Sequence, residues 1–187
     1  MPRYETDPPR LPTNQERYDF VIEAGFASLG QPPQWYVIGN GDPYYKCVAW
    51  TLGLKYAPFP ETPGDTLPID QVDAFYQQGC GYQKVNVPAN NTFQLYDVLA
   101  YGPDMNNVAH VAVYLDVPGV GPTWTSKMGV AQLITHTWMQ LVPGPYGTNF
   151  PAYYTHGGTM PPLPPEDGES FEQTAQRLLR QYGLDRL

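Results

Sequence analysis

The sequence predicts an α+β domain, with helices in the first half of the chain and an antiparallel sheet in the second. Apolar residues recur at the three- and four-residue spacings of amphipathic helices in residues 17–30 and 69–79. From residue 82 onward, short alternating segments separated by turn residues are typical of antiparallel strands. A parallel sheet would instead require strands and helices that alternate along the chain.

The segments before residue 80 favour three helices and one short strand. We expect a helix at 17–30, with Asn14 as its N-cap and Gly30 as its stop, followed by a strand at 35–38. A second helix starts at Cys47 and runs to about residue 56, because Pro58 and Pro60 forbid its continuation. The third helix, 69–79, is expected to end at Gly79.

The rest of the chain predicts strands and one C-terminal helix. The strand candidates are 82–87, 95–101, 110–117, the region around 124–126, and 150–155. The final helix, 170–183, carries an apolar stripe of Phe171, Ala175, Leu178, Leu179 and Tyr182. We expect this stripe to pack on the domain, on a second copy in a homodimer, or on a partner protein.

These patterns divide the chain into four parts. Residues 1–16 form an extended N-terminal arm, 17–158 the domain itself, 159–169 a proline-rich linker and 170–187 the C-terminal helix. With 42% hydrophobic and 15% charged residues, the chain is expected to fold around a core.

Composition also limits the partners. The net charge of −8 and the lack of a basic cluster argue against nucleic-acid binding. No apolar run reaches the ~18 residues of a membrane span. The first residues contain no apolar signal core, so we expect a cytoplasmic protein or one secreted without a classical signal peptide.

Cys47 is the leading candidate for a catalytic residue. It follows the turn-forming run 39–43 and opens a helix, where unpaired N–H groups favour a thiolate. A bridge between Cys47 and Cys80 is the alternative that would remove this nucleophile. His110 begins the most apolar strand, so we expect its ring at the rim of the core, where it can act as the base.

With these two residues placed, the chain resembles the papain-like cysteine hydrolases, which include the bacterial cysteine, histidine-dependent amidohydrolases and peptidases. The motifs are Lys46-Cys47-Val48-Ala49-Trp50 and Ala109-His110-Val111-Ala112-Val113-Tyr114. Together with Trp-Thr-Ser-Lys-Met-Gly at 124–129 and Ile-Thr-His at 134–136, they are similar to an uncharacterised family of bacterial domains over about residues 35–150. Lys46 and Ala109 depart from its pattern, which has Asn and Thr at these positions.

The resemblance implies a papain-like fold and a third residue that orients the histidine. Strand alternation places Trp124 and Ser126 on one face, so either Ser126 or His136 is the candidate. Asn40 and Tyr45 are candidate oxyanion donors by position, and Lys127 is a candidate substrate contact. The scattered histidines and cysteines match no zinc spacing, so we expect no metal and no cofactor.

The sequence therefore favours a thiol-dependent amide or acyl hydrolase or transferase. Its substrate would be a protein or peptide, and by analogy it would suit a bacterial effector or toxin that acts after delivery. The alternative is a non-catalytic protein-binding module on the same fold, using fifteen tyrosines and the proline-rich segments as its surface.

Overall fold

A computed structural model describes residues 3–41, 46–54 and 66–185. In these residues seven strands form one antiparallel sheet in the order β1-β8-β7-β6-β4-β9-β3. The strands are β1 (Val37–Gly39), β3 (Gln83–Val85), β4 (Val98–Gly102), β6 (His110–Val117), β7 (Gly121–Lys127), β8 (Leu133–His136) and β9 (Asn149–Thr155). A separate pair joins β2 (Leu67–Pro68) to β5 (Asn107–Val108). The predicted α+β class is confirmed.

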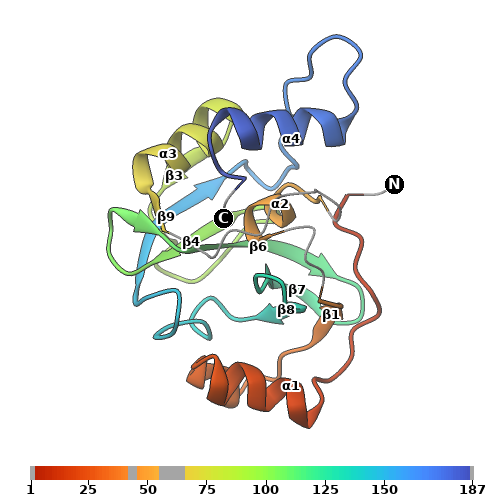
Figure 1. Ribbon diagram of the computed structural model, residues 1–187, viewed down its shortest axis with the longest axis vertical. Coiled ribbons are helices and arrows are strands. Elements are labelled where there is room, and N and C mark those ends of the chain that lie inside the picture. Colours follow the sequence, from red (N-terminus) through yellow and green to blue (C-terminus); the bar gives the residue numbers. More distant parts are fainter. Residues whose placement is uncertain (1–2, 42–45, 55–65, 186–187) are drawn as a thin grey trace.

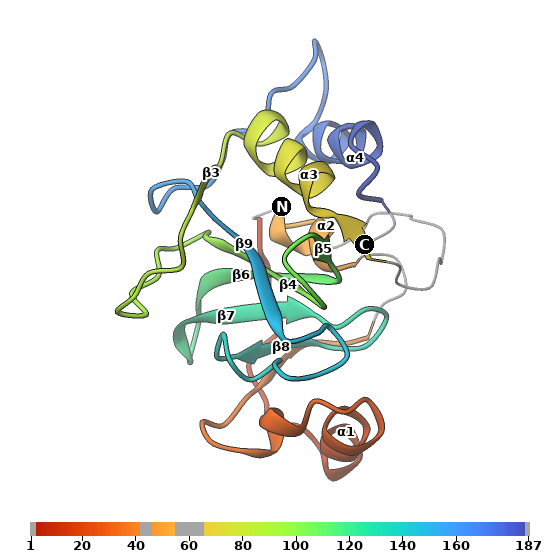
Figure 2. The ribbon, with the colours of Figure 1, turned by 90° about the vertical axis from the view of Figure 1, so that its left-hand side faces the viewer.

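Helices cover both faces of this sheet (Figures 1 and 2). On one side lie α2 (Cys47–Thr51), α3 (Ile69–Asp73) and α4 (Phe171–Gln181), and a π-helical segment, Ala74–Gly79, continues α3. On the other side lies α1 (Asn14–Tyr18), continued by a π-helical turn, Asp19–Glu23, and a 3₁₀ turn, Ala27–Gly30. Each face has its own apolar core, since the buried side chains form two separate clusters.

The helix boundaries differ from the prediction at the N-terminus. The first helix begins at Asn14 and not at residue 17, because Thr13 and Glu16 form a reciprocal capping box. Asn14 is thus the first helical residue and Thr13 the N-cap. The helical turns break at Gly25, which has a φ of 82°. The predicted helix 69–79 is confirmed. Among the strands, β8 is one that the sequence does not predict.

Helix α2 is buried on all sides. Each residue from Cys47 to Thr51 is buried. Trp50 donates from its indole N–H to the Thr125 hydroxyl (3.0 Å), which donates in turn to the carbonyl of Val113 (3.0 Å). These bonds tie α2 to the junction of β6 and β7. The predicted extension to about residue 56 falls partly on residues outside the described ones; the helix itself ends at Thr51.

Both ends of the chain meet at the C-terminal end of α2. The Tyr4 hydroxyl donates to the carbonyl of Thr51 (2.7 Å), and the Arg3 guanidinium donates to that of Leu52. Arg3 also donates to the carbonyl of Pro161 (3.2 Å) and lies over the Phe171 ring, 4.0 Å from its centroid. The N-terminal segment is therefore docked on the domain and supplies partners for carbonyls that end a helix.

Helix α4 packs on the same face. Ser170 and Gln173 form a capping box at its start. Its stripe is buried at Ala175, Leu178 and Leu179, and partly buried at Phe171 and Tyr182. The Gln71 amide donates to the carbonyls of Tyr182 (2.7 Å) and Gly183 (3.2 Å). The predicted stripe is thus covered by the chain itself. Among the described residues, no helix has the length and apolarity that a membrane crossing requires.

Candidate functional site

Cys47 opens α2 and lies against the beginning of β6. Lys46 precedes it with extended backbone, so the cysteine is the first helical residue. Its side chain is only 5% exposed. The backbone N–H groups of Val111, Val48 and Cys47 itself lie close enough to the sulfur to lower the pKa of the thiol. The thiol therefore lies beside the residue that follows His110.

The sheet is open at this point. N–H groups alternate in direction along a strand, and that of Tyr114 points to Asp97 beside β4, so that of Val111 points toward β7. Pairing between β6 and β7, however, extends only as far as Val113 opposite Thr125. The Val111 N–H thus lies where the two strands separate, and it is close enough to the Cys47 thiol to lower its pKa.

Three polar side chains on neighbouring strands form a chain of hydrogen bonds beside this gap. Nε2 of His110 on β6 lies 2.9 Å from Oγ of Ser126 on β7. Oγ of Ser126 lies 2.7 Å from Nε2 of His136 on β8. Nδ1 of His136 lies 2.8 Å from the carbonyl oxygen of Thr137. Both candidates for the third residue, Ser126 and His136, therefore belong to one network.

The last acceptor fixes the direction of every proton in the network. A carbonyl oxygen only accepts, so Nδ1 of His136 carries the proton and its Nε2 is an acceptor. The Ser126 hydroxyl then donates to His136, and its oxygen accepts the Nε2–H of His110. Nδ1 of neutral His110 is left with its lone pair. This nitrogen is the one nearer the backbone of His110.

Burial governs the charge of all these groups. It raises the pKa of Cys47 to about 11, although backbone hydrogen bonds from Val111 and Val48 act in the opposite direction. Burial lowers the pKa of His136 to about 4, and it holds that of His110 well below 6.5, helped by the nearby His136. In the resting state the Cys47 thiol and both imidazoles are therefore neutral. The expectation that the helix start favours a thiolate is wrong for this state.

The position predicted for His110 also requires correction. The ring is 1% exposed and lies within the core, not at its rim. It points to the sheet face opposite α2, with Ser126 and His136 beside it. The reason is the pleat: Val111 and Val113 face α2, so His110 and Ala112 face the other side.

Tyr146 is the site residue that the sequence did not indicate. Its ring stacks flat on that of His110, with 4.0 Å between centroids and 3° between planes. Burial raises the pKa of Tyr146, and so does the electrostatic effect of Cys47. Tyr146 lies between β8 and β9 in a turn of Gly-Pro-Tyr-Gly. Because tyrosines are common throughout this chain, nothing in the sequence distinguishes this one from the others.

The structure describes two of the three remaining predicted residues, Asn40 and Lys127. Asn40 is exposed and follows β1. Tyr45 lies outside the described residues. Lys127 is fully buried and donates from Nζ to the carbonyl of Gly129, which anchors the turn after β7.

The cysteines and histidines could instead form a disulfide bridge or hold a metal ion. Cys47 and Cys80 are both free thiols, so no bridge removes the candidate nucleophile. Within the described parts of the chain, no group of three or more His, Cys, Asp or Glu side chains is placed to hold a metal ion.

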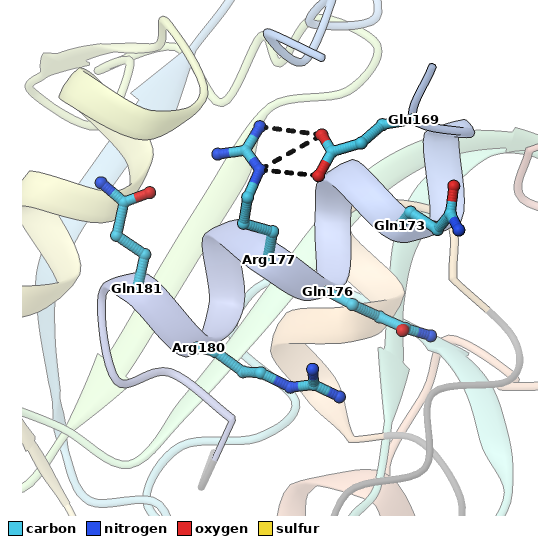
Figure 3. A pocket seen from close by; sticks show the side chains of 6 residues that line it. All are labelled: Glu169, Gln173, Gln176, Arg177, Arg180 and Gln181. Atoms are coloured by element: carbon cyan, nitrogen blue, oxygen red, sulfur yellow. Dashed lines mark hydrogen bonds and ion pairs between the residues drawn. The ribbon is translucent and has the colours of Figure 1, made fainter. Parts of the chain in front are cut away.

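A hollow of about 560 Å³ lies elsewhere, on the outer surface of α4 (Figure 3). Glu169, Gln173, Gln176, Arg177, Arg180 and Gln181 line it. Arg177 is held there by the Glu169 carboxylate, with its Nε 2.9 Å from Oε1. Its lining consists of charged and amide side chains and does not include Cys47, so it is a separate surface feature.

Fold and site together define an α+β domain with a buried cysteine at the start of a helix and a His-Ser-His network on the adjoining strands. The chain belongs to the family described as a domain of unknown function (DUF7689), which matches residues 36–154. This span is close to the residues over which the motifs were recognised. Comparisons with curated proteins and with solved structures give no match.

Proposed function

We propose that the chain is a papain-like cysteine hydrolase or acyltransferase that acts on amide bonds. The observation that supports this most strongly is the direction of the hydrogen-bond network. It leaves His110 neutral with the lone pair on Nδ1, one residue before Val111, whose backbone N–H lies close enough to the Cys47 thiol to lower its pKa. A neutral imidazole base and a cysteine at the start of a helix are the groups required for nucleophilic attack with proton removal.

The reaction follows from these positions. The Cys47 sulfur attacks the carbonyl carbon of the amide while Nδ1 of His110 takes the thiol proton. Ser126 and His136 hold the imidazole in one tautomer, as the third residue does in other triads. The N–H of Cys47 contributes to binding of the oxyanion, with Asn40 and Tyr45 as the candidate second donors.

Collapse of the tetrahedral intermediate breaks the C–N bond, and His110 returns the proton to the leaving amine. Water then attacks the thioester and gives its proton to His110, which releases the acid and restores the thiol. In a transferase, an amine replaces water in this second step.

The substrate is a protein or peptide: a peptide bond, a side-chain amide or a cell-wall peptide. The enzyme would act as a peptidase, amidase or deamidase, either in the cytoplasm or as a bacterial effector or toxin exported without a classical signal peptide. Lys127 no longer serves as a substrate contact in this proposal, since its ammonium group binds the chain itself.

Alkylation with iodoacetamide tests the proposed nucleophile. We expect Cys47 to be modified at least about ten times faster than Cys80 at pH 8, because burial raises the pKa of Cys80 further than that of Cys47 and the thiolate reacts. Mass spectrometry of the two peptides from the native protein gives both rates.

His110→Gln is the matched variant for this measurement. It should slow the modification of Cys47 and leave that of Cys80 unchanged. Equal rates at the two cysteines in the wild-type protein would argue against a nucleophile at position 47.

The burial of the site favours a second candidate, a non-catalytic protein-binding module on the same fold. The Cys47 side chain is 5% exposed and its pKa is raised to about 11, as for a structural cysteine. Cys47→Ser separates the two functions. It would abolish turnover by an enzyme, whereas a binding module would keep both its stability and its partner.

A further inference from the structure

Tyr146 is the closer of the two aromatic residues whose rings lie against that of His110. The two planes are nearly parallel, and their centroids are 4.0 Å apart. Tyr101, the other aromatic neighbour, lies 5.8 Å away and is tilted by 45°. His110 is therefore restrained at its edge by Ser126 and across its face by Tyr146.

The turn that carries Tyr146 has little freedom to move. Gly144 and Gly147 exchange backbone hydrogen bonds, which close a tight loop around Pro145 and Tyr146. Gly147 has a φ of 105°, and a Cβ there would lie 2.2 Å from the carbonyl oxygen of Gly102 on β4. The turn is thus seated directly on the strand that pairs with β6, and it presents the tyrosine ring to His110.

A single hydrogen bond from Nε2 leaves the imidazole able to rotate about its Cβ–Cγ bond. Such rotation would move Nδ1 away from the sulfur and break the bond to Ser126. A flat ring stacked on the imidazole opposes this rotation, because tilting the imidazole would drive its edge into the tyrosine. The stack also covers the ring from water, which favours its neutral form.

We propose that Tyr146 is a positioning residue that holds His110 in the orientation and tautomer needed to accept the Cys47 proton. The inference rests on the proposed function, and it assigns the work to the aromatic ring of Tyr146 and not to its hydroxyl.

The test compares Tyr146→Leu with Tyr146→Phe in the full-length chain. The first readout is ¹⁵N NMR of the imidazole of His110. We expect the Nε2–H tautomer in the wild-type protein and in Tyr146→Phe, and averaging between tautomers in Tyr146→Leu. Unchanged signals in Tyr146→Leu would overturn the proposal, and so would loss of the tautomer in Tyr146→Phe.

The second readout is the rate of Cys47 alkylation between pH 6 and 9. Base assistance by a neutral imidazole gives a rate that changes little with pH, whereas an unassisted thiol of raised pKa reacts about tenfold faster for each pH unit. We expect the flat profile in the wild-type protein and in Tyr146→Phe, and the steep profile in Tyr146→Leu, with a rate at pH 7 lower by about tenfold or more.

Phe93→Leu is the structural control. Phe93 packs in the same core cluster, against Trp124 and Tyr114, and has no contact with His110. It should lower the melting temperature about as much as Tyr146→Leu while keeping the tautomer and the flat profile. If the profile of the wild-type protein is itself steep, the proposed function fails, and the NMR readout still decides whether Tyr146 positions His110.

Discussion

Deletion of residues 161–187 is expected to leave a chain that no longer folds cooperatively. The segment supplies four buried leucines: Leu163, Leu178, Leu179 and Leu184. At about 1.5–3 kcal/mol for each large side chain, their loss removes about 6–12 kcal/mol, comparable with the whole stability of an ordinary domain. Circular dichroism during thermal unfolding should show a broad transition or none.

Single substitutions in α4 measure how much each side of this helix contributes to the free energy of unfolding. Leu178→Ala should cost about 2–5 kcal/mol in urea unfolding, because Leu178 is buried against the domain. Arg180→Ala, on the exposed face of the same helix, should change stability by less than about 0.5 kcal/mol. A truncated chain that melts at the wild-type temperature would show that α4 contributes nothing to the domain.

Acid is expected to destabilise the protein well above the pH at which carboxylates titrate. In the folded state the pKa of His136 is about 4, whereas the unfolded value is near 6.5. Below pH 6.5 the unfolded chain therefore binds protons that the folded chain excludes, and stability falls as the pH is lowered toward 4. His136 alone accounts for a loss on the order of 3 kcal/mol across this window, and His110 adds to it.

Urea unfolding at pH 7.5 and pH 4.5 measures this loss. His156→Gln is the matched control, since it removes the half-buried histidine of the loop after β9 and keeps both fully buried rings. The Glu16 carboxylate contributes in a lower window: Arg10 holds its pKa at about 2, so its contribution disappears only as the pH falls from about 4.5 toward 2. Constant stability between pH 7.5 and 4.5 would show that the fold accommodates protonated rings at positions 110 and 136.

The strands and the polar network could be predicted wherever local patterns were regular. Alternation along 124–127 placed Ser126 on the face of Trp124, and β7 has this geometry, with Thr125 turned to Trp50 on α2. His136 was predicted as a candidate without its strand, because β8 has only four residues and so carries too short a pattern of alternation.

The charge of the site could not be predicted, because burial is a property of the whole fold. The sequence places Cys47 at a helix start, where local N–H groups favour a thiolate. The covering of α2 depends on Tyr4 and on α4, whose positions no local pattern reveals. Tyr146 was missed for a related reason: its stack on His110 depends on how the turn sits on Gly102.

The contacts of Arg3 have a consequence for biogenesis. This guanidinium joins the end of the cysteine helix to Pro161, a carbonyl 158 residues further along the chain, and to Phe171. Ribosomes synthesise proteins from the N-terminus, so Arg3 emerges long before either partner. The cysteine helix thus gains the support of these contacts only after Pro161 and Phe171 have been synthesised. A nascent chain stalled before Pro161 would carry Cys47 without that support.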